Sequence, residues 1–309
     1  MRGWLFFISS VIIRVWYYLI ILEFNKGSNK MDIPDGAFNW KTNGYTPVFN
    51  DEFKAPTLDR SKWRTIEGGE IVTQRKSYMD FNTNGRIEDG SVVFKATRDA
   101  GKVVNGTAYD FFSAAIQSIK KFSGVLYFEA RMALPTKSRW MSSTFKLVPT
   151  IPTEYNSWLK RMEVTITSSP QDDGSFIACE YICGGTTRDS FITGTFKKQI
   201  IGVDSFHTYA FSIEEDRIKF IYDGEVVLEK VIAGETINGQ IMVGAKPFDT
   251  VEWQPHVGLE FRGPWIAGLA EMLPQEMKVD YVRVFVQGAE EEGGVGNTIR
   301  GKKMRLIQG

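Results

Sequence analysis

The feature of this chain that most constrains its fold is a long series of short β-type runs separated by turn residues. Residues 217–228 hold two such runs on either side of Asp223-Gly224, a pair typical of two-residue hairpin turns. Residues 125–134 alternate in polarity, and residues 279–286 are apolar on both faces, as expected of a strand between two sheets. Because long helical periodicity with caps is absent, the pattern predicts an all-β fold, an antiparallel β-sandwich or jelly roll.

The charges of the 309 residues balance, with 37 Lys and Arg against 37 Asp and Glu. A chain without net charge lacks the excess of positive charge that is typical of nucleic-acid-binding proteins, so that class of partner is set aside. An apolar fraction of 43% and a charged fraction of 24% are those of a globular protein, which excludes disorder throughout. Aromatic residues make up 13%, and these rings either fill a large β core or form platforms on which sugars stack.

The two cysteines, Cys179 and Cys183, are four residues apart. On one strand this spacing separates them by roughly 13 Å, beyond what a disulfide tolerates. We therefore expect two free, mostly buried thiols unless a tight bend brings them together. His207 and His256 are distant in sequence, so no zinc site and no other metal site is predicted.

Residues 4–24 are almost wholly apolar, and a helix of that length would span about 31 Å, enough for a bilayer core. Arg14 interrupts the segment, and no small-residue cleavage site follows its first half. Residues 1–24 are thus interpreted first as an uncleaved signal anchor and second as a poorly matched secretory signal. A third alternative is that translation begins at Met31. The first two alternatives predict a membrane-anchored or secreted domain that faces a lumen or the exterior.

Two further segments flank the predicted sandwich. Residues 25–46 are polar and rich in Gly, Ser and Asn, which is typical of a linker. Residues 288–309 are rich in glycine and carry an acidic run followed by basic residues, which predicts a solvated, flexible tail.

Two segments of the chain are the most distinctive, IKKFSGVLYFEAR at residues 119–131 and MKVDYVRVF at residues 277–285. They resemble the KFSYGYFEARxKLP strand and the closing MxVDYVRVY strand of glycoside hydrolase family 16, the laminarinase and lichenase type of endo-β-glucanase. Further matches occur at residues 48–53, 58–63, 84–96, 205–210 and 218–224, and all the matches have the same order along the chain as in that family. The resemblance implies a concanavalin A-like jelly roll over residues 47–287 and a β-glucan as its partner.

The chemistry of that family is carried by one strand, written E-[IV]-D-[IV]-x-E, whose carboxylates are nucleophile, helper and general acid/base. The corresponding segment here reads Glu163-Val-Thr-Ile-Thr-Ser168. The resemblance therefore implies that Glu163 is the nucleophile, while Thr165 replaces the helper Asp and Ser168 replaces the acid/base. The shorter spacing found in the family would put the acid/base at Thr167, again without a carboxylate.

Retaining hydrolysis needs two carboxyl groups about 5–5.5 Å apart. A hydroxyl cannot protonate the leaving oxygen near neutral pH, and positioned general acid catalysis contributes about 10²–10⁴-fold. We therefore expect impaired catalysis unless a neighbouring acid substitutes. Glu180 is the best candidate because residues 175–183 are expected to form the adjacent strand, although Ile182 there replaces a family histidine. The other candidates are Glu154, Asp172 and Asp173.

Several aromatic and polar residues are candidates for contacts with sugar. The resemblance places Trp140, Trp158 and Trp265 in the cleft, where indole rings would pack on sugar faces. Core filling is the alternative for all three, and it is the preferred interpretation for Trp63 and Phe128. Weaker candidates for the cleft lining are Tyr78, Asn84 and Arg86.

Three functions are carried forward. The first is a catalytically impaired β-glucan-binding protein attached to a membrane by residues 1–24. The second is an active retaining endo-β-1,3(4)-glucanase with a relocated acid/base. The third is a structural or adhesion sandwich without affinity for sugar. No cofactor is expected, and no cluster of ligands in the sequence secures the calcium ion that the family commonly carries on its convex face.

Overall fold

The computed structural model describes residues 38–73, 75–136, 141–151, 161–167, 176–185, 191–199, 202–262, 268–288 and 298–300. All of them belong to one compact unit, Asp35–Gly309. The strands are β1 (Tyr45–Asp51), β2 (Trp63–Thr65), β3 (Gly68–Val72), β4 (Arg75–Met79), β5 (Gly85–Glu88), β6 (Ser91–Val104), β7 (Thr107–Ser118), β8 (Lys121–Ser123), β9 (Leu126–Ala133), β10 (Met141–Thr150), β11 (Arg161–Thr167), β12 (Phe176–Gly184), β13 (Phe191–Gln199), β14 (His207–Ile213), β15 (Arg217–Tyr222), β16 (Glu225–Val231), β17 (Thr236–Ile237), β18 (Gln240–Ile241), β19 (Glu252–Phe261), β20 (Gln275–Gln287) and β21 (Thr298–Arg300). Two four-residue helices, α2 (Phe81–Asn84) and α3 (Leu269–Met272), complete the described elements.

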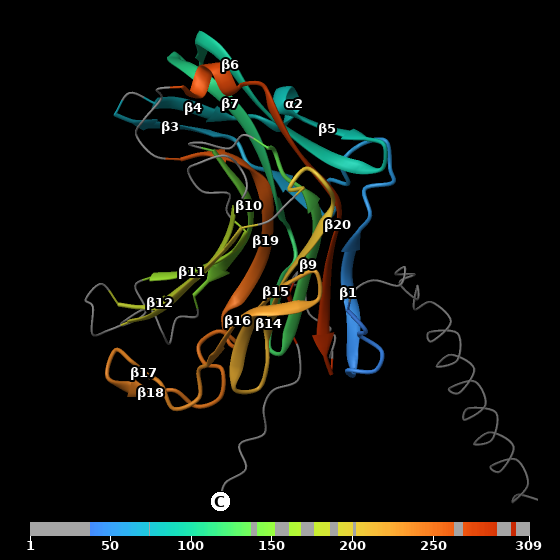
Figure 1. Cartoon of the computed structure of the whole chain (residues 1–309), viewed down its shortest axis with the longest axis vertical. Coiled ribbons are helices and arrows are strands. Elements are labelled where there is room, and N and C mark those ends of the chain that lie inside the picture. The colour runs from blue at the N-terminus through green and yellow to red at the C-terminus, as the bar shows by residue number, and fades with distance from the viewer. Residues whose placement is uncertain are drawn as a thin grey trace, which may run out of the picture. The chain divides into compact units, whose positions relative to one another are not determined.

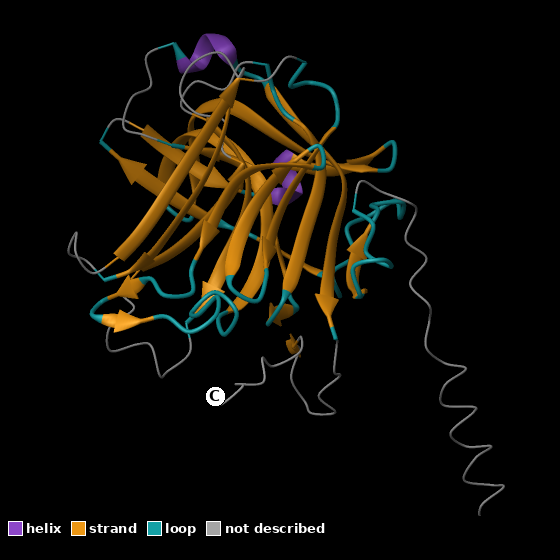
Figure 2. Ribbon diagram, turned by 60° about the horizontal axis from the view of Figure 1, so that its bottom comes forward, coloured by secondary structure: helices purple, strands orange, loops and turns teal. Residues whose placement is uncertain are grey.

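The strands form two layers (Figures 1 and 2). One layer, the Glu129 sheet, has the order β16-β15-β14-β9-β20, with β6 and β1 sharing the other edge of β20 and β5 beyond β6. The second layer, the Glu163 sheet, has the order β13-β12-β11-β10-β19, with β7 and β8 on the other edge of β19 and β2 beyond β7. The predicted antiparallel β-sandwich is confirmed.

The two sheets are connected at one end of the sandwich. The long strands β6 and β7 pair with each other, so that each sheet passes into the other there. The hairpin β3–β4 extends this connection, because β4 pairs in parallel with β7. Figure 1 shows β3, β4, β6 and β7 together beyond the ends of β10 and β19.

Alternation along the strands places the core between the sheets. Leu126 and Phe128 of β9 are fully buried in it, and so are Met162, Val164 and Ile166 of β11. The predicted hairpin is also formed, because Asp223 and Gly224 join β15 to β16 with φ values of 48° and 82°. Both residues need positive φ in such a turn, which the Asp-Gly pair tolerates.

Trp63 and Phe128 fill the core, as expected. Both are at most 1% exposed and both belong to the main apolar cluster. The indole Nε1 of Trp63 donates a hydrogen bond of 2.8 Å to Asp51 Oδ2, so its polar group is satisfied inside the sandwich.

The outer face of the Glu129 sheet is more buried than simple alternation predicts. Tyr127 and Glu129 point outward from β9, yet their exposed fractions are 5% and 1%. The ring of Phe38 stacks on Tyr127 with centroids 3.6 Å apart, which covers this part of the sheet. Glu129 accepts hydrogen bonds from the hydroxyls of Tyr281 at 2.8 Å and Tyr127 at 3.3 Å.

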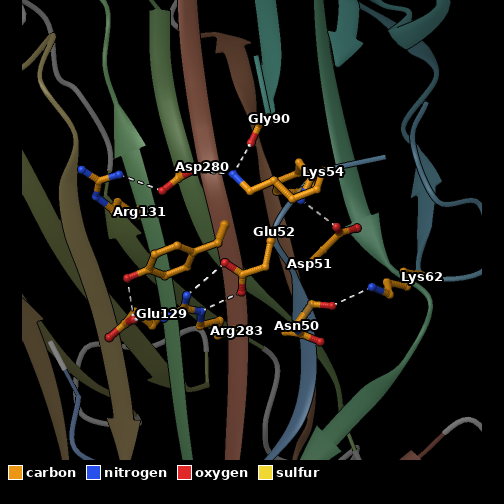
Figure 3. A network of polar contacts seen from close by, with 12 residues as sticks. Asn50, Asp51, Glu52, Lys54, Lys62, Gly90, Glu129, Arg131, Asp280 and Arg283 are labelled. Atoms are coloured by element: carbon orange, nitrogen blue, oxygen red, sulfur yellow. Dashed lines mark hydrogen bonds and ion pairs between the residues drawn. The ribbon is translucent and has the colours of Figure 1, made fainter. Parts of the chain in front are cut away.

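Ion pairs extend this outer network across β9, β20 and the residue that follows β1 (Figure 3). Arg283 donates to both carboxylate oxygens of Glu52, at 2.9 and 3.0 Å, and its Nη1 lies 3.9 Å from Glu129. Farther along the sheet, Arg131 bonds to Asp280 at 2.7 Å. The charged side chains on this outer face therefore link neighbouring strands through ion pairs.

Described elements occur in both segments that flank the predicted sandwich. Strand β1 begins at Tyr45, and Phe38 packs on the sheet, both within residues 25–46. Within residues 288–309, β21 pairs in parallel with β8, whereas β20 ends at Gln287. The predicted domain boundaries stay predictions.

The predicted state of the cysteines is confirmed, since Cys179 and Cys183 are both buried and free. Residues 1–24, to which the prediction of a signal anchor applies, lie outside the described residues. Among the helices that the structure describes, none has the length and apolar character required to cross a bilayer.

Candidate functional site

Strand β11 presents Glu163 and Thr165, two residues of the predicted catalytic motif, on the outer face of its sheet. Met162, Val164 and Ile166 alternate into the core, so Glu163 and Thr165 point the opposite way. Glu163 is exposed, whereas Thr165 is 5% exposed and lies against its neighbours. We call this outer surface of β7, β10, β11, β12 and β19 the Glu163 face.

The pairing register places a continuous row of side chains beside Thr165. On one side Thr165 is opposite Glu180 of β12, and on the other side it is opposite Lys146 of β10. Lys146 is in turn opposite His256 of β19, which is opposite Gln117 of β7. Directly opposed residues of antiparallel strands point to the same face, so all five side chains belong to the Glu163 face.

Glu180 is a diagonal neighbour of Glu163. Glu163 is opposite Ile182, and Glu180 is two residues before Ile182 on the same face of β12. Diagonal neighbours have Cβ atoms roughly 7–8 Å apart, and two glutamate side chains at that spacing can bring their carboxyl groups closer together. The sequence nominated Glu180 as a substitute acid, and the register places it on the correct face. Glu154, Asp172 and Asp173 lie outside the described residues.

A second polar cluster on this face was missed by sequence reasoning. Glu260 Oε1 accepts from Lys146 Nζ at 2.6 Å and from His256 Nε2 at 2.8 Å. His256 and Glu260 are four residues apart, which would separate their Cα atoms by roughly 13 Å on a straight strand. Their contact therefore requires β19 to curve inward on this face, and Figure 1 shows β10 and β19 curving together.

Gly258 allows β7 to approach β19 closely between the positions of these two residues. It lies between His256 and Glu260 on the same face and pairs with Ala115 of β7 and Thr144 of β10. A Cβ at this position would lie 2.3 Å from the Cβ of Ala115 and 2.8 Å from the backbone oxygen of Ala114. Only glycine fits this close approach of two strands.

The surroundings of the Glu260 carboxyl group favour its ionised form. Burial alone would raise its pKa, but the hydrogen bond from His256 and the charge of Lys146 outweigh burial and hold the pKa well below its usual range. Burial lowers the pKa of His256, so this ring is neutral and donates its Nε2 proton to Glu260. Glu260 is thus an ionised group at neutral pH, and β10 separates its strand from β11.

The structure describes only some of the predicted site residues. Ser168, Trp140, Trp158 and Trp265 lie outside the described residues. Tyr78 is on β4, and its ring packs against Tyr109 with centroids 5.1 Å apart.

Asn84 and Arg86 have structural partners away from the Glu163 face. Asn84 is buried, and its amide donates to Lys95 O at 3.0 Å and to Thr97 Oγ1 at 2.9 Å, which fixes α2 against β6. Arg86 belongs to β5 of the other sheet, and its guanidinium bonds to Glu276 at 3.0 and 3.1 Å. The polar groups of both residues are thus used in holding strands together, and their role in lining a cleft stays a prediction.

Two other features complete the description. An open cavity of about 610 Å³ lies on the outer face of the Glu129 sheet, on the other layer from Glu163, and Tyr45, Tyr127, Glu214 and Arg217 are among its lining residues. Within the described part of the chain, no three His, Cys, Asp or Glu side chains gather in a way that would hold a metal ion.

No protein-family model matches this chain, and no curated protein sequence matches it. Solved structures do share its fold. An endo-acting O-glycanase of prominent human gut bacteria, described as initiating mucin breakdown, has a TM-score of 0.66 at 19% identity, covering 82% of this chain and 94% of its own. A non-specific endo-β-1,3(4)-glucanase of family GH16 has a TM-score of 0.63 at 19% identity, covering 84% and 94%. An endo-β-1,3-glucanase from Pyrococcus furiosus has a TM-score of 0.59 at 19% identity, covering 78% and 94%.

The two-layer sandwich is therefore the fold of the carbohydrate-active jelly rolls. More narrowly, it is the fold of the family 16 β-glucanases, in agreement with the resemblance of the strand motifs.

Proposed function

We propose that this domain binds a β-glucan across the Glu163 face and hydrolyses it slowly or not at all. The observation that carries the proposal is the row beside Glu163, where Lys146 and Glu180 flank the hydroxyl of Thr165. The shared fold supports a glucan as the ligand. A laminarinase variant of that fold, from Zobellia galactanivorans, forms a complex with laminaritriose and laminaritetraose.

In this proposal hydrolysis is weak because hydroxyl groups occupy the two positions at which the resembling family carries its helper and acid/base carboxylates. Glu163 can attack an anomeric carbon, but the leaving oxygen then needs a proton from a carboxylic acid about 5–5.5 Å away. Thr165 offers a hydroxyl at the helper position, and the sequence has Ser168 at the acid/base position. Neither hydroxyl can supply that proton near neutral pH.

Binding is tested by affinity electrophoresis through gels that contain laminarin or lichenan. We expect the wild-type protein to be retarded, and we expect Glu163→Gln to be retarded as well, because this substitution removes a nucleophile but little surface. A matched control is bovine serum albumin, which should migrate equally in gels with and without glucan. Unretarded migration of the wild-type protein in both glucans would reject the proposal in favour of a structural or adhesion sandwich.

A second candidate function is supported by the placement of Glu180. In this alternative, protonated Glu180 gives its proton to the glycosidic oxygen while Glu163 attacks the anomeric carbon and forms a glycosyl ester. Glu180 then takes a proton from water, and the resulting hydroxide cleaves the ester and releases Glu163. The diagonal arrangement of Glu163 and Glu180 on one face is compatible with such a retaining pair.

Reducing-end release from laminarin distinguishes the two candidates when the wild type is compared with Glu180→Gln and Glu163→Gln. The binding proposal predicts a wild-type rate at or near background that Glu180→Gln leaves unchanged. The second candidate predicts a measurable wild-type rate that falls at least about 10²-fold in either variant. Hydrolysis that survives in Glu163→Gln would contradict the assignment of this residue in both candidates.

We also propose that residues 1–24 place the domain outside the cytosol, as a membrane anchor or an export signal. The apolar composition of the segment supports this proposal. Expression of the full chain and of a version that starts at Met31 provides the test, followed by separation of membrane, soluble and secreted fractions. An anchor predicts the full chain in the membrane fraction, and a cleaved signal predicts it in the secreted fraction. If both versions have the same distribution, the proposal is wrong.

A further inference from the structure

The cavity of about 610 Å³ opens on the outer side of the sandwich, over β9, β14, β15 and β16. Its floor contains one row of outward side chains, because Ser212 of β14 is opposite both Tyr127 of β9 and Lys219 of β15. Ile221 and Val226, opposite each other on β15 and β16, continue the lining beside that row. The cavity therefore crosses four neighbouring strands, and its volume lies within the range of sites for small ligands.

Aromatic rings form one part of the lining. Phe38 stacks on Tyr127 with ring centroids 3.6 Å apart, and Tyr45 meets Phe38 nearly at a right angle at 5.3 Å. Phe285 also contacts Phe38, at 5.5 Å, so the rings hold one another in place. Phe38 and Tyr45 both remain partly exposed and line the cavity. Such rings offer an apolar surface on which one face of a ligand can pack.

The charged part of the lining comes from β15 and from the turn that joins β14 to it. Lys219 Nζ pairs with Glu214 at 2.8 Å, and Ser212 Oγ donates to the same carboxylate at 3.3 Å. The guanidinium group of Arg217 bonds to both oxygens of Asp216, at 2.7 and 2.9 Å. Because these groups hold one another, the polar part of the lining is already ordered before a ligand enters.

The charges that line the cavity nearly cancel. The lining holds three carboxylates and two cations, namely Glu214, Glu215, Asp216, Arg217 and Lys219, which leaves a net charge of −1. Glu229 of β16 adds a further carboxylate that pairs with both cations. An anionic ligand would therefore be repelled. A cationic ligand would compete with Arg217 and Lys219 for their carboxylates, and Glu215 is exposed, where solvent weakens its charge.

A saccharide satisfies the mixed chemistry of this lining. Each sugar hydroxyl both donates and accepts a hydrogen bond, and the cavity offers donors on Lys219 and acceptors on Glu214 and Glu215. Hydrogen bonds between a hydroxyl and a charged group are stronger than those between neutral groups. The apolar face of a sugar ring can meanwhile pack against Tyr45. A cation would use the acceptors alone.

We propose that this cavity, which we call the Tyr45 cavity, is a second saccharide site that binds a neutral segment of β-glucan. The choice of β-glucan rests on the proposed function. The Tyr45 cavity and the Glu163 face are on the outer sides of opposite layers (Figure 1), and packed sheets are about 10 Å apart. A short oligosaccharide cannot reach both sites. A domain with both sites would thus bridge two glucan chains, and bridging requires no hydrolysis.

The test counts the laminarihexaose molecules bound per protein by isothermal titration calorimetry. We expect two for the wild type, one for Val226→Arg and one for Glu163→Arg. Val226 lines the cavity and is 53% exposed, so the arginine obstructs the site without disturbing the core. Glu163 is exposed on the other layer, and its replacement obstructs the Glu163 face in the same way.

Two further variants show whether an effect belongs to the cavity. The matched control is Val103→Arg, because Val103 of β6 is 64% exposed and does not line the cavity, and this variant should still bind two molecules. Lys219→Met removes a donor but keeps the length of the side chain. Combined with Glu163→Arg, it should weaken the remaining site about tenfold. Thermal unfolding verifies that each variant is folded.

The outcomes separate this inference from the proposed function. One molecule bound by the wild type, kept in Val226→Arg and lost in Glu163→Arg, overturns the second site and leaves the proposed function in place. The reverse pattern supports the Tyr45 cavity and rejects the Glu163 face as the glucan site. Two molecules bound by Val226→Arg, or a loss of the same site in Val103→Arg, also overturn the second site.

A cationic competitor tests the class of ligand. Trilysine should not displace laminarihexaose from the site that remains in Glu163→Arg. If trilysine displaces it, the saccharide assignment is overturned in favour of a cation site. Absence of any laminarihexaose binding by the wild type would overturn both the second site and the proposed function.

Discussion

Asp249, in the turn before β19, shows how one unsatisfied side chain limits stability. Its Oδ1 atom is buried and has no hydrogen-bond partner among the described residues, and burial raises the pKa of the carboxyl group from 3.8 to about 6. The folded state therefore binds more protons than the unfolded state between these two values. By linkage, stability decreases as pH rises through this window and stays lower above it.

We predict that Asp249→Asn stabilises the protein at neutral pH, because the amide cannot ionise. The gain in the free energy of unfolding relative to wild type should grow by about 2 kcal/mol between pH 4.5 and pH 7.5. Urea denaturation at the two pH values measures it. A gain of equal size at both would show that ionisation of Asp249 is not the cause.

The two thiols give a second prediction for single residues. Burial raises the pKa of Cys179 to about 12, and its Sγ donates to the backbone oxygen of Ile166 at 2.8 Å. Burial also raises the pKa of Cys183 well above its usual range. We therefore predict that neither thiol of the native protein reacts with a reagent such as DTNB at pH 8. Both thiols should react after denaturation. Rapid native labelling would contradict the described burial.

At the level of residues, the sequence predicted the site only in part. Glu163 and Thr165 could be placed on one face because they share a strand and are two positions apart. Glu260 and Lys146 carried no such signal, because they are 114 residues apart and meet only through the pairing of β10 with β19. The remaining clue was the alternation of polar residues at Gln254, His256 and Glu260, which marks the outer face of a strand but not its neighbours.

Among the elements, the contact between β19 and β7 depends on Gly258. We predict that Gly258→Ala destabilises the protein by about 1–3 kcal/mol, because the added Cβ meets both a side chain and backbone of β7. Chemical denaturation measures the effect.

The matched control for Gly258 is Ala115→Gly, which removes the nearest clashing atom. In a double-mutant cycle, the cost of Gly258→Ala should be smaller when position 115 is glycine. Additive costs would indicate that the close approach of the two strands does not determine the choice of glycine.

The prediction of elements succeeded where polarity alternates and failed where contacts between distant segments decide burial. The hairpin at Asp223-Gly224 was predicted because the turn chemistry is local. Burial of Glu129 was not predicted, because its partners Tyr281 and Arg283 come from another strand and Phe38 covers its neighbour from a segment interpreted as a linker. The strand β21 in the tail is formed by pairing with β8, which its own composition does not indicate.

For the molecule as a whole, the order of the strand motifs predicted the sandwich correctly, since each motif occupies one strand and their order fixes the topology. The motifs could not show which side chains become neighbours across strands. The register supplied that information, and it places Lys146 and Glu180 on either side of Thr165. The three tryptophans expected in the cleft lie outside the described residues and stay predictions.

The central claim is that the Glu163 face has a nucleophile without a proton donor. The most direct test is the rate of reducing-end release from laminarin by the wild type and by the double variant Thr165→Asp/Ser168→Glu. We predict a background rate for the wild type and a rate about 10²–10⁴-fold higher for the double variant, since both carboxylates are restored. A wild-type rate equal to that of the double variant would contradict the claim and would identify the protein as a working glucanase.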